Sequence, residues 1–391
     1  MFLLNGCAEK QTESIIRENL FTLQIGRLED QIAFYNQDGD RGVRRNGLCM
    51  SEGIFYISDP EGQKVARFNS YGDILTMIYN EETNPQPLTL KPKRDGESVT
   101  RWAFTYPFQK PGKIVINAQK HLYVEDNIPD ERQGFDPESK ALLDSVVLHF
   151  DADGRFLEYL GQEGVGGSPF PRIEGLYTSA NDDLAVVCRL PTGWNIYWFD
   201  MNGVLLYLIK IKNTSVPIPS DREDVVFASL DNIVADPDAR KLYIKIDYYR
   251  DTFDDSTNTR TGSESDSSVI WVMRVEDGIY EKNIETPLYE SVYMENNRRV
   301  VIKIPYTLLG ITKGERVFLY FPEENGYALL ILDTRESSGI QHQGNIRVDM
   351  NELQFNAFDL SREGILSAML ISDWEVKLVW WRTDKFFGED G

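Results

Sequence analysis

Two apolar runs on either side of a polar turn decide the fold: Val146-Val147-Leu148-His149-Phe150, then Asp151-Ala152-Asp153-Gly154, then Arg155-Phe156-Leu157-Glu158-Tyr159-Leu160-Gly161. The turn has hairpin chemistry, because Gly adopts a positive φ easily and Asp bonds the local backbone. We interpret the runs as two antiparallel strands. A further apolar run, His121-Leu122-Tyr123-Val124, lies upstream and predicts a strand before this pair.

The same pattern recurs six times along the 391 residues. Second strands are predicted at 53–57, 121–124, 183–186, 241–244, 316–319 and 364–366. Third strands are predicted at 65–68, 146–150, 195–199, 269–275, 328–332 and 376–381. Strand repeats of this length indicate a β-propeller, because one blade buries both of its faces only when neighbours stack on it. We predict an all-β chain with a single six-bladed β-propeller of four-stranded antiparallel blades; five or seven blades are the alternatives.

The last blade lacks an outer strand of its own. After Trp380-Trp381-Arg382-Thr383-Asp384 the sequence has only 385–391, which contains no convincing strand. Residues 20–26, LFTLQIG, match the fourth-strand pattern of 156–161. We therefore predict that the N-terminal strand closes the last blade, which removes the weak edge of the ring. The predicted domains are a tether at 1–19 and a propeller at 20–391.

The net charge of −21 argues against a nucleic-acid partner, since an acidic surface repels phosphate. No apolar run approaches the roughly 20 residues of a membrane-spanning helix. The three cysteines do not form a framework. Cys49 and Cys188 lie inside apolar strands and are expected to be buried thiols, with a disulfide between them as the alternative.

The N-terminal Leu4-Asn5-Gly6-Cys7 resembles the lipobox of bacterial lipoproteins, in which the Cys becomes lipidated. Only six residues precede Cys7, whereas a signal peptide needs a basic start and an apolar stretch of about 7–15 residues. The resemblance implies lipidation of Cys7 and a bacterial cell-envelope location, periplasmic or surface-facing. The alternative is an ordinary thiol on a frayed terminus.

The repeat over residues 20–388 resembles an NHL-type six-bladed propeller and is similar to envelope propeller lipoproteins without an assigned activity. The resemblance implies a monomeric ring. It rests on a loose repeat, with the second-strand copies above and turns such as Asp200-Met201-Asn202-Gly203.

Long insertions are predicted on a single rim of the ring, at 80–112, 126–145, 212–225, 247–268 and 281–298. Loops on a rigid scaffold commonly carry binding residues. Arg and aromatic side chains anchor interfaces and stack on ligands. The alternative is that they fold their own loops. Residues 251–268, which are polar and acidic, are predicted to be disordered. The binding candidates are Arg94, Arg101, Trp102, Tyr106, Phe108, Arg132, Phe135, Tyr248, Tyr249 and Arg250.

Local catalytic motifs are missing from the sequence. His121, His149 and His342 are scattered, and we expect no metal site and no cofactor. We predict a non-enzymatic, lipid-anchored scaffold that binds an envelope protein or cell-wall component through the long-loop rim. The alternative is a metal-dependent hydrolase or lyase with its site in the central channel. The inner-strand residues that would test this alternative are Asn117, Glu174, Asp231 and Asn356.

Overall fold

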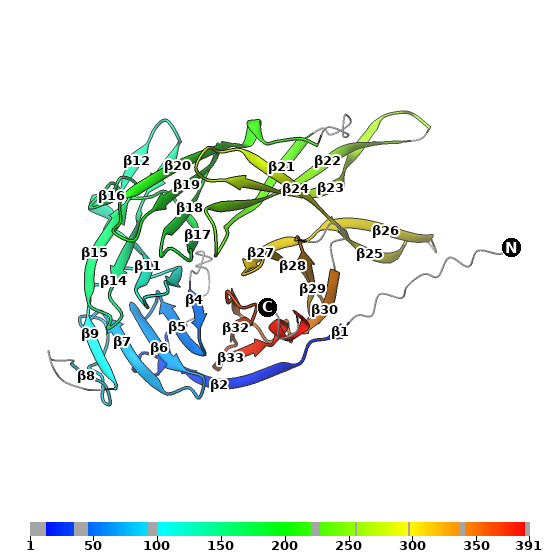
Figure 1. Cartoon of the computed structure of the whole chain (residues 1–391). Coiled ribbons are helices and arrows are strands. Elements are labelled where there is room, and N and C mark those ends of the chain that lie inside the picture. The colour runs from blue at the N-terminus through cyan, green and yellow to red at the C-terminus, as the bar shows by residue number, and fades with distance from the viewer. Residues whose placement is uncertain are drawn as a thin grey trace.

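The computed structural model describes residues 13–34, 46–92, 100–219, 227–254, 256–295, 298–335 and 341–387. Within them the chain forms six sheets of four or more strands and two small two-stranded sheets. Figure 1 shows the large sheets arranged around a ring. The all-β propeller predicted from the repeats is therefore confirmed. Among the described residues no helix is long and apolar enough to span a membrane.

In each blade the first three strands follow the chain in order, from the inner strand outwards. Blade 1 has β4 (Leu48–Ser51), β5 (Ile54–Asp59), β6 (Lys64–Asn69) and β7 (Ile74–Tyr79), extended by β9 (Trp102–Thr105) and β8 (Lys91–Pro92). Blade 2 has β10 (Ile114–Ile116), β11 (Leu122–Asn127), β14 (Ser145–Phe150), β15 (Phe156–Gly161) and β16 (Gly164–Val165). Blade 3 has β17 (Ile173–Thr178), β18 (Leu184–Leu190), β19 (Gly193–Phe199) and β20 (Leu205–Lys212).

The second half repeats this arrangement. Blade 4 has β21 (Phe227–Ala235), β22 (Lys241–Phe253), β23 (Arg260–Arg274) and β24 (Tyr280–Thr286). Blade 5 has β27 (Thr307–Thr312), β28 (Arg316–Glu323), β29 (Gly326–Asp333), β30 (Gln341–Arg347) and β1 (Glu13–Ser14). Blade 6 has β31 (Phe355–Leu360), β32 (Leu366–Ile371), β33 (Glu375–Trp381), β2 (Arg17–Ile25) and β3 (Gln31–Ile32).

Apolar packing between blades holds the ring together. The described residues contain six buried clusters, each made of side chains from two neighbouring blades. The inner strands also meet in a cycle, β4–β10–β17–β21–β27–β31 and back to β4. Since every blade buries one face on the blade before it and one on the blade after it, the alternating pattern of the repeats leads directly to a closed ring.

The N-terminal strand closes this ring, as predicted. β2 pairs antiparallel with β33, with Phe21 opposite Leu378 and Leu23 opposite Val376. The ring of Phe21 also packs on Phe55 of blade 1, with centroids 5.6 Å apart. The closing strand therefore joins blade 6 and buries side chains against blade 1.

Two buried charged side chains fasten the segment that follows β2 to blade 1. Asp59 accepts hydrogen bonds from Ala33 N (2.8 Å) and Gly62 N (2.8 Å), and Lys64 Nζ donates to Leu28 O (2.6 Å). Both side chains are fully buried. Burial raises the pKa of Asp59 to about 6 despite the nearby Lys64.

The predicted disorder of residues 251–268 is wrong. β22 and β23 continue their pairing to Phe253 and Arg260, beyond the core of blade 4. Ion pairs join the two strands, from Arg250 to Glu264 (2.8 Å) and from Arg260 to Asp251 (2.8 Å). The backbone ladder that starts in the core thus extends into a polar sequence, in which opposite charges pair across the two strands, and composition alone does not reveal this pairing.

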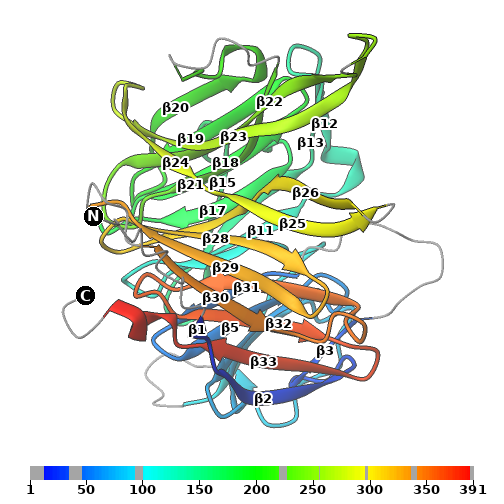
Figure 2. The same cartoon turned by 90° about the vertical axis from the view of Figure 1, so that its right-hand side faces the viewer.

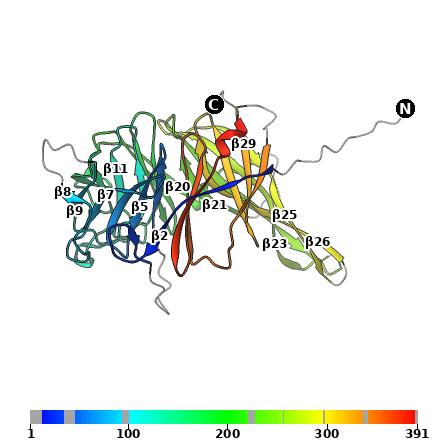
Figure 3. The same cartoon turned by 90° about the horizontal axis from the view of Figure 1, so that it is seen from below.

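Hairpins project from one side of the ring. The tip of β22–β23, the hairpin β12–β13 (Gly134–Asp136 and Ala141–Leu143) and the hairpin β25–β26 (Leu288–Glu295 and Arg298–Pro305) all lie on the same side in Figure 2. Figure 3 shows β25 and β26 standing out beside β23. The remaining elements are short 3-10 helices, η1 (Asp130–Arg132), η2 (Asn213–Ser215) and η3 (Thr383–Phe387).

Insertion 80–112 differs from the rim loop that was predicted. Its strands β8 and β9 pair on the outer edge of blade 1, with β9 parallel to β7. Residues 93–99 lie outside the described part of the chain. The insertion therefore widens a blade, because the edge of β7 offers unpaired backbone groups that β9 satisfies.

Candidate active site in the central channel

The inner strands surround a cavity of ≈ 620 Å³ on the axis of the ring. All six blades contribute to its lining, which mixes apolar side chains with hydroxyl, amide, acidic and basic groups. The polar side chains are Asn46, Ser51, Lys113, Arg172, Glu174, Tyr177, Thr178, Asn232, Thr307, Tyr320, Asp359, Ser361, Arg362 and Glu363. A cavity with a few placed polar groups is the usual form of a small-molecule site.

Asp359 of β31 is the acid with the most perturbed environment in this lining. Its Oδ2 accepts a hydrogen bond from Met50 N of blade 1 at 2.8 Å. Among the described residues Oδ1 has no hydrogen-bond partner. Burial raises the pKa of Asp359 to about 7, because the single backbone donor only partly offsets the loss of water. The carboxyl group therefore exchanges a proton near neutral pH.

Cys49 lines the same part of the channel on β4 and is 6% exposed. Burial, together with the nearby Asp359, raises the pKa of this thiol well above its usual value. A protonated thiol is a poor nucleophile, so Cys49 contributes shape and polarity rather than attack. Both Cys49 and Cys188 are free, so the alternative of a disulfide between them is wrong.

Glu174 enters the channel on the opposite side of the ring, in blade 3. A β-bulge places it there: Ile173 pairs with Cys188 and Gly175 with Val187, which leaves Glu174 as the extra residue. Arg172 Nε lies 2.8 Å from Glu174 Oε1. Bulges commonly redirect a side chain next to a functional site. The channel thus holds Glu174 of blade 3, which is paired with Arg172, and Asp359 of blade 6, whose pKa is about 7.

One end of the channel is tied by contacts between the short turns of neighbouring blades. Asp182 of blade 3 accepts from Ala118 N of blade 2 (2.9 Å). Arg240 Nε of blade 4 donates to Asp183 Oδ2 of blade 3 (2.7 Å). Lys120 of blade 2 pairs with Glu52 of blade 1 (2.9 Å).

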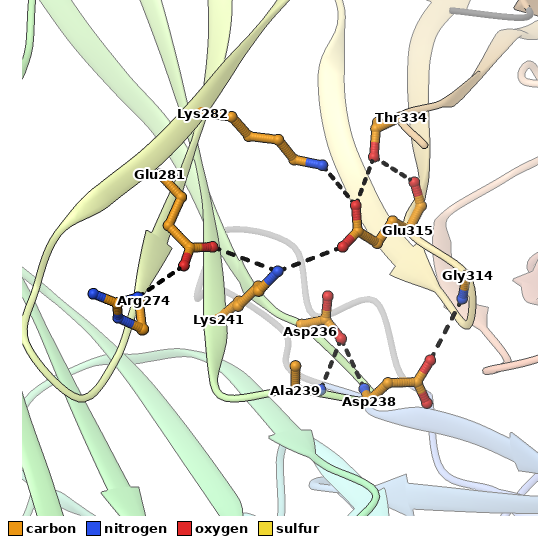
Figure 4. A network of polar contacts seen from close by, with 10 residues as sticks. All are labelled: Asp236, Asp238, Ala239, Lys241, Arg274, Glu281, Lys282, Gly314, Glu315 and Thr334. Atoms are coloured by element: carbon orange, nitrogen blue, oxygen red, sulfur yellow. Dashed lines mark hydrogen bonds and ion pairs between the residues drawn. The ribbon is translucent and has the colours of Figure 1, made fainter. Parts of the chain in front are cut away.

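Polar contacts also join blades 4 and 5, as Figure 4 shows. Lys282 Nζ donates to Glu315 Oε2 (2.6 Å), and Lys241 Nζ reaches Glu315 Oε1 (3.5 Å). Arg362 of blade 6 donates to Asp238 Oδ1 of blade 4 (2.7 Å). Because Arg362 lines the channel and lies in the short turn between β31 and β32, this ion pair braces the channel at the end with the short turns.

The four inner-strand candidates behave differently. Glu174 lines the channel, as expected for a hydrolase or lyase with its site there. Asp231 instead contacts Lys245 Nζ (3.3 Å) and Leu308 N (3.3 Å), at the junction with blade 5. Asn356 donates to Tyr327 OH (2.9 Å), and Asn117 accepts from His121 N (2.8 Å) within a turn. Three of the four are therefore structural contacts.

The rim candidates are spread over the molecule. Phe108 and Tyr248 are fully buried, so they belong to the core. Tyr106 packs against Phe108, with ring centroids 4.9 Å apart, and Tyr249 stacks on Phe227 at 4.6 Å. Phe135 on β12 and Arg132 in η1 are exposed. Three others contact neighbouring residues: Arg250 pairs with Glu264, Arg101 lies 3.3 Å from Asp73, and Trp102 donates to Asp153 O. Arg94 lies outside the described residues.

Sequence reasoning missed two groupings. Asp359 was overlooked because an acid inside FNAFDL carries no motif; its signal is an isolated acid in an inner strand. His121 and His149, interpreted as scattered, lie next to each other in blade 2, directly before β11 and on β14. His121 Nδ1 lies 2.9 Å from His149 Nε2, and His149 Nδ1 lies 3.3 Å from Glu158 Oε1. Strand pairing of β11 with β14 unites them, which linear spacing does not show.

A divalent cation does not fit the donor set in the described part of the chain. No three His, Cys, Asp or Glu side chains converge there in a way that could hold a metal ion. The two channel acids, Glu174 and Asp359, come from opposite blades.

The comparisons with known proteins concern the fold. No family model matches the sequence, and no curated protein matches it. Solved structures do match: a gluconolactonase from Xanthomonas campestris (13% identity, 87% of each chain, TM-score 0.38) and a glucose dehydrogenase (8%, 93% of this chain and 98% of that one, 0.40). A calcium-binding protein, regucalcin, from Agrobacterium tumefaciens also matches (10%, 86% and 90%, 0.37).

The prediction was a non-enzymatic scaffold, whereas a gluconolactonase and a glucose dehydrogenase are among the structures that share this fold. That prediction relied on the absence of local catalytic motifs. In a propeller the groups that meet on the axis come from separate blades, so a motif search along the chain does not find them. Identities this low establish similarity in fold alone.

Proposed function

We propose that this protein is an enzyme whose active site is the central channel, with Asp359 as the acid–base residue in hydrolysis or elimination of a small polar molecule. The observation that carries the proposal is the Asp359 carboxyl group, with a pKa of about 7, one oxygen held by Met50 N and the other without a partner among the described residues. General acid–base catalysis is most effective when the pKa lies near the working pH.

In hydrolysis, the ionised Asp359 takes a proton from the attacking water and returns it to the leaving oxygen, so the enzyme ends in its starting state. In elimination, it removes the proton from carbon and then protonates the departing hydroxyl group. Glu174 and Arg172, on the far side of the channel, orient the substrate by accepting from and donating to its hydroxyl groups. The proposed substrate is a small hydroxylated molecule, because the lining offers donors and acceptors of both charges.

The test is a screen of small lactones, esters and hydroxy acids against the wild-type protein, Asp359→Asn and the control Asp373→Asn. Asp373 is exposed in the turn before β33, remote from the channel lining. We expect turnover by the wild type and the control, and a loss of about 100-fold or more in Asp359→Asn. Equal turnover by Asp359→Asn and the wild type would reject the proposal.

We also propose that the protein is lipid-anchored through Cys7 in the bacterial envelope. The support is the sequence Leu4-Asn5-Gly6-Cys7; Cys7 lies outside the described residues. The chain expressed in bacteria behind a lipoprotein signal peptide should partition into detergent, and Cys7→Ala should not. Partition of both variants into the aqueous phase would contradict the anchor. The NHL subclass and an envelope partner stay predictions.

A further inference from the structure

A second cavity, of ≈ 600 Å³, lies at the junction of blades 4 and 5 beside the hairpin β25–β26. It is separate from the channel, since the two share no lining residue. Buried polar groups form part of its wall: Ser268 is 1% exposed and Thr286 is 6% exposed. Its lining is Asp266, Ser267, Ser268, Glu285, Thr286, Pro287, Leu288, Tyr289, Glu290, Lys303, Tyr306 and Gln343.

The charge of this lining is mainly negative. It contains Asp266, Glu285 and Glu290, against a single basic residue, Lys303. Arg250 lies near the edge, 4.0 Å from Asp266 Oδ1, and pairs more closely with Glu264 (2.8 Å). Acids drawn from β23, β24 and β25 therefore surround the cavity from more than one side.

Tyr306 provides an independent indication of a ligand. This side chain is 7% exposed and lines the cavity, and its hydroxyl group has no hydrogen-bond partner among the described residues. Tyr289 differs, because its hydroxyl donates to Glu323 Oε1 (2.8 Å) and its ring stacks on Phe321 with centroids 4.0 Å apart. A hydroxyl group that makes no hydrogen bond within the described part of the protein keeps its full capacity to bind a ligand in the cavity that it lines.

We propose that this cavity binds a small organic cation with protonated amine groups, of the linear polyamine class. The ammonium groups pair with the carboxylates of Glu285, Glu290 and Asp266, and one N–H donates to the Tyr306 oxygen. The methylene chain packs on the rings of Tyr289 and Tyr306, which attract a neighbouring cation through their π faces. Alkylammonium fits better than a metal ion, because the carboxylates do not converge on one point.

Isothermal titration calorimetry with spermidine tests this site on the full chain, without any assay of activity. Glu290→Gln should weaken binding by about fivefold or more, because it removes a charge-assisted hydrogen bond. Tyr306→Phe should weaken it by about threefold to tenfold and keep the ring packing. Lys303→Gln should strengthen binding, since it removes the one competing positive charge in the lining.

Asp373→Asn is the control for general attraction of polyamines to a chain with net charge −21. It should leave spermidine affinity unchanged. The ammonium groups could come from a free polyamine or from the lysine side chains of a peptide, and titration with trilysine separates these two sources. Tighter binding of spermidine than of trilysine indicates a free amine. Tighter binding of trilysine would reject the free amine in favour of a peptide. Equal effects of Asp373→Asn and Glu290→Gln, or no effect of Tyr306→Phe, would overturn the site.

Discussion

Burial of the Asp359 carboxylate in the channel wall destabilises the folded protein, and it also raises the pKa into the range that suits the proposed acid–base role. Met50 N is its one hydrogen-bond donor among the described residues, and the channel wall removes much of its water. By contrast, Asp126 accepts from the backbone N–H groups of Gln109, Lys110 and Asn127, and these donors define the turn around it. A buried acid with several backbone donors is structural, whereas one with a free oxygen facing a cavity is available for chemistry.

Asp359→Asn is expected to change how stability depends on pH. The pKa of Asp359 is about 7 in the folded protein and near 3.8 when unfolded. Between these values the folded state binds more protons, so this group's contribution to the free energy of unfolding is largest below pH 4 and falls as pH rises through 7. The variant should therefore be more stable than the wild type at pH 8, by about 2 kcal/mol after allowance for solvent in the channel.

Urea unfolding at pH 4 and pH 8 measures this difference. The two proteins should have nearly equal stability at pH 4, where Asp359 is protonated, and should diverge at pH 8. Parallel pH dependence of the two proteins would show that Asp359 titrates normally in the folded state.

At the scale of elements, strands with alternating apolar residues and hairpin turns were predictable. The run 146–150 and the turn 151–154 reappear as β14 and a turn in which Asp151 Oδ1 accepts from Arg155 N (2.8 Å) and Gly154 has φ 94°. The continuation of β22–β23 was not predictable, because its cross-strand ion pairs join residues 14 and 9 positions apart, Arg250 with Glu264 and Asp251 with Arg260. Such pairs depend on register, which composition does not contain.

Removal of β2 is expected to destabilise the whole ring. A chain that begins at residue 26 loses the pairing with β33 and the burial of Leu23 and Phe21. Burial of these two side chains alone corresponds to about 4 kcal/mol. A chain that lacks only residues 1–12 keeps β2 and is the matched control.

Thermal unfolding of the two trimmed chains measures this effect. We expect a markedly lower Tm and aggregation through the exposed edge of β33 only in the chain that begins at residue 26, with recovery when a peptide of residues 13–34 is added. Equal Tm values in the two trimmed chains would show that β2 does not close the ring.

For the whole molecule, ring closure followed from the sequence because each repeat buries its faces on the next. The site did not, because its members are separated by large stretches of chain: Cys49 and Asp359 meet only when blade 6 closes on blade 1. Glu174 was identified as an inner-strand acid, but the bulge that turns it inward is a feature of register. Propeller sequences thus predict the scaffold better than the residues on its axis.

The pH dependence of kcat/KM for wild type and Asp359→Asn, from pH 5 to 9 on a substrate found in the screen, shows whether Asp359 is the acid–base residue. We expect an inflection near pH 7 in the wild type, and a loss of about 100-fold or more in the variant with no inflection there. An unchanged profile in Asp359→Asn would contradict this role and would place the chemistry outside the channel acid.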